Sequence, residues 1–557
     1  MNRNQNSHFS KNPQVDIQRS RFDRSSSVKL SFNVGDLIPF YVDEVLPGDT
    51  FSIDTSKLVR MQTLVTPVMD NMYLDTYYFF VPNRLLWEHW QNFCGENTDS
   101  VWVPQTEYHI PTISMQQDHA IGTIADYMGI PINGQSAPTI SVNALPFRAY
   151  ALIWNEWFRD QNLQDPQYVP TGDTSPDYGT YGQNPLYQAC FGLAPLKAGK
   201  FRDYFTSCLP SPQKGPDVLL PLGNTAPVVP LQESIDFEHY KNTLGRMVPM
   251  RWADSSDGSA AVTSGVHNIL GSATGTAVDD TASSSATYTP AYISNLWTDL
   301  TQATSATINQ LRLAFQIQRI YEKDARGGTR YIEILSNHFG VTSPDSRLQR
   351  PEYLGGNRML INVNQVVQNS ESATTPQGTT TAYSLTVDNH SDFTHSFVEH
   401  GFLIGLCVAR YDHTYQQGLE RFWMRKQRFD FYWPSLASVG EQPVYNYQIF
   451  CQDSADANNG VFGYQEAWAD YRYKPNRVAG EMRSGTAKSL DVWHLADKYS
   501  QLPTLSDTWI QEDKTNVDRC LAVTSAVSNQ LFGDFYVRNI CTRPMPLFSI
   551  PGLIDHH

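Results

Sequence analysis

The most constraining feature of this 557-residue sequence is an apolar run that has no polar face. Residues 73–90 read YLDTYYFFVPNRLLWEHW, and only aromatic residues and valine occupy positions 77–81. A strand with one face in water alternates apolar and polar residues. Since this strand does not alternate, the protein's core must cover one face, and an insertion or a neighbouring subunit must cover the other. We therefore predict that Tyr77–Phe80 is buried, that Pro82 ends the strand, and that a helix follows over 84–90.

Strand patterns elsewhere lie at both ends of the chain. Val28, Leu30 and Phe32 alternate with polar residues, and the same kind of pattern predicts strands in the segments 27–54, 58–81, 381–393, 396–415 and 443–450. The middle contains helical spacings, over 146–164, 307–322 and 330–340. Strands from both ends of a chain can pair in a Greek-key sandwich or jelly roll, so we predict a mainly β protein whose insertions carry short helices.

Two segments of low complexity interrupt this pattern. Residues 254–289 and 366–382 are rich in Ser, Ala, Thr and Gly. Neither can bury enough apolar area to form a core of its own. We expect both segments to be exposed loops.

Few residues are charged, and the charges are unevenly distributed. Charged residues make up 17% of the chain, against about 25% in typical soluble domains. This favours a surface that is largely buried in an assembly, although a secreted or carbohydrate-active β protein would also fit.

The chain carries a net charge of −15, yet its first thirty residues are basic. That basic arm could bind phosphates or could serve as a solubilising terminus, and charge alone leaves both open.

No motif for catalysis or for a cofactor is present. The seven cysteines include no CxxC pair, which indicates reduced, mostly buried thiols in a cytoplasmic product. Gly199-Lys200 lacks the other residues of a phosphate-binding loop, and DSADANNG at 453–460 departs from a calcium-binding loop. We expect no enzyme activity, no cofactor and no metal.

No apolar stretch is long enough to span a bilayer, so we also expect no membrane insertion.

Two segments combine basic and aromatic residues. RFWMRKQRFDFYW at 421–433 interleaves Arg421, Arg425 and Arg428 with aromatic rings, and YRYKPNRVAGEMRS at 471–484 is similar. Cations for phosphates and flat rings for bases are typical of sequence-tolerant single-strand binding. The alternative, which we favour, is an interface strand whose arginines pair with acids of a neighbouring subunit, because arginine and aromatic residues are enriched at protein interfaces.

Several long blocks resemble one family. The chain is similar to the major capsid protein of the Microviridae, small single-stranded DNA bacteriophages, and within that family to the gokushovirus branch. The resemblance extends from about residue 20 to the C-terminus, and its blocks are 24–88, 148–164, 311–340, 463–484 and 543–557.

The resemblance implies a fold, an assembly and a set of partners. The fold would be an eight-stranded antiparallel jelly roll, with a flexible basic arm over 1–25 and a single capsid domain over 26–557. Sixty copies would form a T=1 icosahedral shell around a circular single-stranded DNA genome, assembled in the cytoplasm of a bacterial host. The expected partners are an internal scaffolding protein, a pilot protein, a small basic DNA-packing peptide and a host cell-surface receptor.

The family resemblance also suggests site residues. A surface insertion would span about 210–300, with 254–289 as its tip, and would touch the host through Asp254, Ser259, Thr274, Asp279 and Ser284. The expected nucleic-acid contacts are Arg3, Lys11, Arg19, Arg21, Arg24, Arg421, Arg425 and Arg428. The alternative function is a secreted-type, β-rich glycan-binding or glycan-hydrolysing protein. A tail-type phage protein would be expected to show repeats, which this sequence lacks.

Overall fold

The computed structural model divides the chain into two compact units. One unit contains Met1–Lys214 together with Asp324–His557, and the other contains Gly215–Lys323. The described residues are 18–96, 107–115, 119–132, 140–216, 218, 228–230, 252–253, 267–272, 275–280, 292–293, 296–298, 308–327, 331–339, 349–374 and 376–548.

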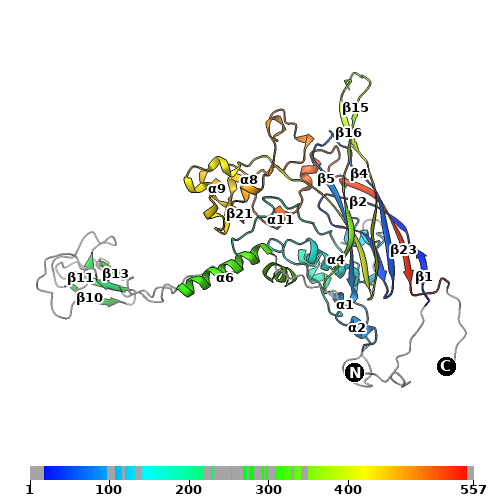
Figure 1. Ribbon diagram of the computed structural model, residues 1–557, viewed down its shortest axis with the longest axis horizontal. Helices are drawn as coiled ribbons and strands as arrows, with labels where there is room; N and C mark the ends of the chain where they lie inside the picture. Colours follow the sequence, from blue (N-terminus) through cyan, green and yellow to red (C-terminus); the bar gives the residue numbers. More distant parts are fainter. Residues whose placement is uncertain are drawn as a thin grey trace. The chain divides into compact units, whose positions relative to one another are not determined.

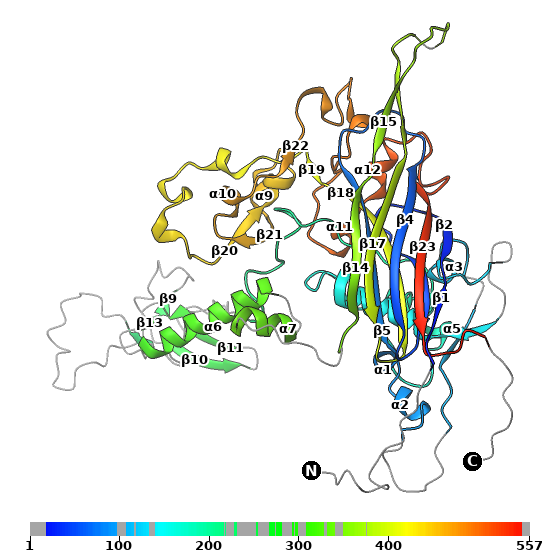
Figure 2. The ribbon, with the colours of Figure 1, turned by 45° about the vertical axis from the view of Figure 1, so that its right-hand side comes forward.

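The first sheet of the larger unit brings the two ends of the chain together. Its order is β1–β23–β4–β17, and β2 also pairs with β23, so that β1 and β2 occupy successive parts of the same β23 edge. Figure 2 shows β17, β4 and β23 side by side. The strands are β1 (Ser20–Asp23), β2 (Ser26–Phe32), β4 (Thr50–Met61), β17 (Thr386–Ser396) and β23 (Leu531–Arg543).

The second sheet of this unit contains the apolar run. Its order is β14–β5–β18–β3, and all of its pairs are antiparallel. Its strands are β3 (Ile38–Val45), β5 (Met72–Pro82), β14 (Glu352–Leu360) and β18 (Gly401–Tyr411). The prediction of a mainly β protein with antiparallel sheets and short helices is therefore confirmed.

Strands of the two sheets pair in a nested order. β5 pairs with β14, β4 with β17, β3 with β18, and β2 with β23. In this order, the stretch of chain between the two strands of each pair contains both strands of the pair named before it. The chain is thus doubled back on itself, and the β5–β14 pair is the innermost of the nested pairs.

One core lies between the two sheets. Along β4, buried and partly exposed residues alternate, as one covered face requires. Phe51 and Ile53 of the first sheet and Tyr78, Phe80 and Leu403 of the second belong to the same buried cluster. The Tyr78 hydroxyl is 2.7 Å from the Thr55 Oγ1 of the opposite sheet, which satisfies a polar group inside this core.

A second core covers the other face of the second sheet. Phe79, Ile404 and Leu406 pack there against the insertion that follows β5, and the hydroxyl of Tyr150 in that insertion donates a 2.8 Å hydrogen bond to the Leu37 carbonyl. Tyr78, Phe79 and Phe80 are 0%, 1% and 1% exposed, and Tyr77 is half-buried. The burial predicted for Tyr78, Phe79 and Phe80 is confirmed, whereas Tyr77 stays partly exposed. The insertion that covers the outer face belongs to the same chain.

Two long insertions carry the helices of this unit. Between β5 and β14 lie α1 (Asn83–Leu86), α2 (Trp90–Phe93), β6 (Thr112–Ser114), α3 (Ile124–Tyr127), β7 (Ser141–Asn143), α4 (Leu145–Ile153), the π-helical turn Trp154–Phe158, α5 (Tyr178–Tyr181), the 3-10 turn Pro185–Tyr187, α7 (Tyr331–Ile334) and the π-helical turn Leu335–Phe339. Pro82 ends β5 as predicted, but the helix expected over 84–90 is two short helices. Trp87 between them is extended, and its indole N–H donates to Asp173 at 2.8 Å.

The second insertion connects β18 to β23. It contains β19 (Thr414–Tyr415), β20 (Glu441–Tyr445), α8 (Asn446–Ile449), α9 (Ala455–Asn459), β21 (Val461–Glu466), α10 (Ala469–Arg472), β22 (Asn476–Arg477), α11 (Asp507–Ile510), α12 (Lys514–Asp518) and 3-10 turns at Arg421–Met424, Arg428–Asp430, Pro434–Leu436, Gly480–Met482 and Asp491–Trp493. The hairpin of β15 (Val363–Val367) and β16 (Thr380–Ser384) precedes β17 and carries the exposed second low-complexity segment.

Two local predictions are corrected in this insertion, and the structure of the DSADANNG segment is defined. The strand expected over 443–450 ends at Tyr445 and continues as α8, because the Asn446 side chain donates to the Ala457 carbonyl instead of facing a neighbouring strand. The segment 421–433 forms 3-10 turns, and not the interface strand considered above. The DSADANNG segment is α9, capped by the Ser454 hydroxyl, which accepts from the Ala457 N–H.

The described residues of the smaller unit form short antiparallel pairs and a helix. β10 (His267–Ser272) pairs with β11 (Gly275–Asp280), β9 (Trp252–Ala253) with β12 (Tyr292–Ile293), and β8 (Val228–Pro230) with β13 (Leu296–Thr298). The predicted helix over 307–322 is α6 (Ile308–Gly327), whose last residues pass into the larger unit. Among the described residues, no helix is both long and apolar enough to cross a bilayer.

Candidate functional site

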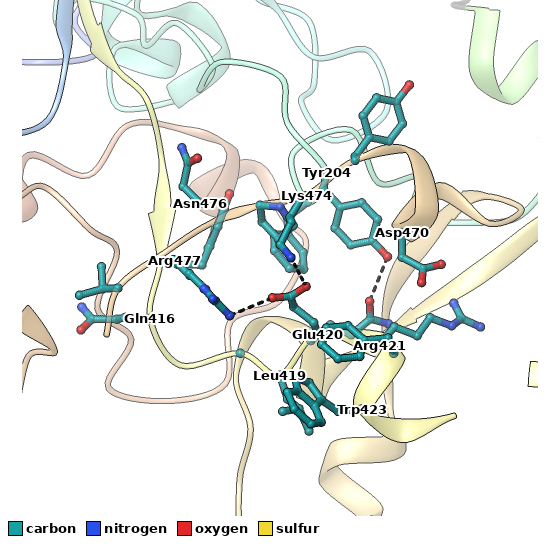
Figure 3. A pocket seen from close by; sticks show the side chains of 18 of the residues that line it. Tyr204, Gln416, Leu419, Glu420, Arg421, Trp423, Asp470, Lys474, Asn476 and Arg477 are labelled. Carbon is teal, nitrogen blue, oxygen red and sulfur yellow. Dashed lines mark hydrogen bonds and ion pairs between the residues drawn. The ribbon is translucent and has the colours of Figure 1, made fainter. Parts of the chain in front are cut away.

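The two basic and aromatic segments come together around one pocket. Residues 420–433 and 470–484, hereafter the basic loops, line a pocket of about 420 Å³ (Figure 3). A parallel pairing of Tyr415 with Arg477 joins the second loop to the chain just before the first. Buried aromatic side chains of Tyr204, Phe205 and Tyr415 belong to a third core and line the pocket. The pocket volume lies within the range of roughly 300–1,000 Å³ that is common for ligand sites.

The basic loops carry a local excess of positive charge. They contain eight basic and four acidic residues, although the whole chain has a net charge of −15. Arg425 forms an ion pair with Asp470 and lies 4.1 Å from the centroid of the Tyr471 ring. Glu420 is shared, at 3.4 Å, by the Nζ of Lys474 and the Nη1 of Arg477 (Figure 3).

Half of these cations have no carboxylate partner in the described part of the chain. Arg421, Lys426, Arg428 and Arg483 form no ion pair there. Arg421 donates at 3.0 Å to the Pro443 carbonyl, and Arg428 lies over the Trp433 ring at 5.0 Å. Their charges are therefore available to a partner outside the subunit.

The carboxylate within the first loop serves its own backbone. The N–H groups of Gln427 and Lys426 donate to Asp430 and lower the pKa of its carboxyl group, and the charges of Arg421 and Arg425 lower it further. Asp430 therefore stays ionised and holds the turn in shape.

Aromatic side chains around the pocket are exposed. Trp423 and Phe429 are 63% and 68% exposed. Other large apolar side chains of the basic loops that reach solvent are Phe422, Met424, Phe431, Tyr432, Trp433, Tyr471 and Tyr473. A monomeric protein seldom exposes so many apolar side chains together, and such patches mark interaction sites.

The arginines of the N-terminal segment lie on a different surface. Arg19 donates at 2.6 Å to the Gly48 carbonyl, Arg21 is exposed on β1, and Arg24 forms a 2.7 Å ion pair with the buried Asp43. In both views β1 lies away from β21 and α9 of the second insertion (Figures 1 and 2). The predicted nucleic-acid contacts therefore fall into two separate groups, and Arg3 and Lys11 lie outside the described residues.

The predicted host-contact residues are mostly outside the described residues. Asp254, Ser259, Thr274 and Ser284 are among those not described. Asp279 lies on β11, opposite Asn268 of β10.

A buried charged cluster was not predicted from the sequence. The Nδ1 of His413 is 3.1 Å from Asp497, its Nε2 is 3.1 Å from Glu512, and the Nζ of Lys200 is 3.4 Å from Asp497. Burial alone would lower the pKa of His413, but Glu512 and Asp497 outweigh burial and raise this pKa to about 10. Despite burial, His413 and Lys200 hold the pKa of Asp497 well below its usual value.

This cluster joins both insertions to the end of β18. Lys200 belongs to the first insertion, whereas His413, Asp497 and Glu512 belong to the second. No sequence signal pointed to it, because its members are isolated residues far apart in the chain. All four side chains are sealed from solvent, so the cluster has a structural role and not a catalytic one.

Comparison with known proteins identifies the family to which the chain belongs. A family described as "Capsid protein (F protein)" matches residues 10–553. The chain belongs to this capsid protein family.

Individual relatives agree along almost the whole length of the chain. The chain is 43% identical to the "Capsid protein VP1" of Chlamydia phage 1, with 98% of this chain and 97% of the relative covered. It is 43% identical to that of Spiroplasma virus 4, with 96% of each covered, and 41% identical to that of Bdellovibrio phage phiMH2K, with 98% and 97% covered.

These similarities confirm the resemblance to the gokushovirus branch of the Microviridae. The protein is a structural major capsid protein and a component of the virion, and it assembles into a shell of many subunits. It is not an enzyme, which excludes the glycan-hydrolysing alternative.

Proposed function

We propose that the two facing sheets form an eight-stranded jelly roll, and that sixty copies close a T=1 icosahedral shell around a circular single-stranded DNA genome. The observation that carries this proposal is the nested pairing of β2 with β23, β3 with β18, β4 with β17, and β5 with β14. A jelly roll has eight strands arranged as two Greek keys, and capsid domains are a common use of it.

Closure of the shell needs no nucleotide hydrolysis. Burial of apolar surface between subunits contributes about 25 cal/mol per Å², and the loss of translational and rotational freedom opposes it. Closed symmetry requires that each contact surface meet a complementary surface on a copy of the same chain. The internal scaffolding protein and the pilot protein are the proposed partners in assembly, which takes place in the host cytoplasm.

Assembly can be tested with purified protein and its scaffolding protein. Sedimentation and negative-stain imaging should show closed particles of one size. Monomers under every condition, with the scaffold present, would contradict the proposal.

For the genome, we propose contact with the N-terminal segment: Arg3, Lys11, Arg19, Arg21 and Arg24. A small basic DNA-packing peptide would share the phosphates. Arg19 and Arg24 also make contacts within the subunit, so two truncations separate the roles. Removing residues 1–17 should reduce genome retention and its salt sensitivity while shells still form, whereas removing 1–24 should also weaken the sheet edge. Full retention of the genome in both truncations would exclude the arm.

The insertion around 210–300 is proposed as a surface protrusion whose tip, 254–289, touches a host cell-surface receptor. Support comes from its composition and from the separate unit Gly215–Lys323. Substitutions at Asp254, Ser259 or Ser284 should change adsorption to host cells without changing particle yield. Unchanged adsorption on every host tested would remove this role and leave the shell intact. DNA contact by Arg421, Arg425 and Arg428 stays a prediction.

A further inference from the structure

The first insertion contains a negatively charged part, whereas the basic loops are positively charged. Residues 85–196, hereafter the acidic insertion, contain eleven acidic and only two basic residues. One of the two, Arg148, is fully buried. The chain therefore carries two surfaces of opposite charge, one on each of the long insertions.

Part of the acidic insertion forms an exposed surface that is also aromatic. The Glu88 N–H donates to the Thr171 carbonyl, which brings Glu88 next to the loop of Asp173. Close by in the sequence, the rings of Tyr181 and Tyr187 stack at 4.6 Å, and Tyr168 lies 4.8 Å from Tyr187. Glu88, Asp165, Asp173 and Asp177 are all exposed.

The part of the acidic insertion around Glu88 lies away from the basic loops of the same subunit. In both views α1 and α2, which flank Glu88, lie at the other end of the larger unit from β21 and α9, which accompany the basic loops (Figures 1 and 2). A copy of the same chain is the partner that presents both surfaces in a shell of identical subunits.

We propose that the basic loops of one subunit dock onto the acidic insertion of a second copy, around Glu88, Asp165 and Asp177. The proposal rests on the assembly of the chain into a shell. The exposed Trp423 and Phe429 supply the kind of aromatic anchor that dominates interfaces, and the cations without partners supply the charge. Since the two surfaces differ, the contact is heterologous, and repeating it closes a ring of subunits about a symmetry axis.

Single-stranded DNA fits the basic loops less well. Glu420 and Asp470 line the pocket and pair with Lys474, Arg477 and Arg425, so they cancel part of the positive charge that a phosphate would need. Met424 is exposed among the rings and offers no flat face on which a base could stack. The N-terminal arginines lie on a different part of the unit, away from these loops (Figures 1 and 2).

Charge reversal tests the docking directly. The loop variant combines Lys426→Glu with Arg428→Glu, and the insertion variant combines Glu88→Lys with Asp165→Lys. All four side chains are exposed, and none forms an ion pair in the described part of the chain. Because the charge of Glu88 acts on the buried Arg148, urea denaturation of each variant checks that folding is retained. Lys498→Glu, at an exposed lysine outside both surfaces, is the matched control.

We expect each double variant alone to lower the yield of closed shells at least tenfold, with the control unchanged. Mixing the two variants, or combining them in one chain, should restore at least part of the yield. Binding of an oligo(dT) strand to unassembled protein is measured in parallel by fluorescence anisotropy.

Two results would overturn the docking. Normal shell yield from the loop variant, with oligo(dT) binding reduced, would assign the basic loops to DNA. A yield that falls and is not restored by the opposite variant would remove the acidic insertion as the partner. Failure of the unmodified protein to form shells would instead refute the proposed function itself.

Discussion

The buried charged cluster gives the sharpest prediction for stability. Replacing His413 by glutamine leaves Asp497 paired with Lys200, and it leaves Glu512 buried without an ion-pair partner among the described residues. Breaking a buried ion pair by removing one partner costs about 3–5 kcal/mol, because an uncompensated charge remains in a medium of low polarity. We expect His413→Gln to lower the free energy of unfolding by about that amount.

The pH dependence of this loss follows from the pKa of His413. This pKa is about 10 in the folded protein and near 6.5 in the unfolded chain. Between these values the folded state holds a proton that the unfolded state releases, so stability falls as pH rises. The stabilisation is fully present below pH 6.5 and is lost as pH approaches 10. The difference between the wild type and His413→Gln should therefore narrow over this window.

Urea denaturation of the unassembled subunit, followed by tryptophan fluorescence from pH 6 to pH 10, measures this difference. His109→Gln, at an exposed histidine, is the control and should change the unfolding free energy by less than about 0.5 kcal/mol. If the loss for His413→Gln is within 0.5 kcal/mol of zero, or stays constant across the pH range, the assignment of a charged His413 is wrong.

Three further outcomes are expected. Phe79→Ala, at a side chain that is 1% exposed, should lower the free energy of unfolding by about 3–5 kcal/mol. Phe532→Ala, at a side chain that is 40% exposed, should lower it by under about 1 kcal/mol. Urea denaturation midpoints measure both variants, and equal losses would refute the second core. Gly356→Ala would place a methyl group against a backbone carbonyl oxygen of β5, so the yield of soluble protein should fall, and a normal yield with unchanged melting would contradict the close packing of β14 on β5. Under native conditions iodoacetamide should label Cys94 and Cys451 first, since the other thiols are buried, and peptide mapping that shows rapid labelling of all seven cysteines would contradict the burial.

The sequence predicted the elements whose evidence is local. The alternation of Val28, Leu30 and Phe32 became β2, the helical spacing over 307–322 became α6, and Pro82 ended its strand. The apolar run also predicted two covered faces, because burial on both sides is the only way to keep such a strand out of water.

The features that sequence reasoning missed depend on contacts between distant residues. The continuation of the 443–450 segment as α8 depends on a hydrogen bond from Asn446 to the Ala457 carbonyl, which no periodicity encodes. The cluster around His413 combines Lys200 with residues more than two hundred positions away. The opposite charges of the two insertions are visible in the sequence, but only the fold shows that α1 and α2, beside Glu88, lie away from β21 and α9 of the second insertion (Figure 1).

An electron-microscopy reconstruction of the assembled particle tests the central claim most directly. We predict a closed icosahedral shell of sixty copies, each with the nested strand pairs of the two sheets, and with the N-terminal segment toward the genome. Particles with another number of subunits, or a subunit in which β2 does not pair with β23, would contradict the account.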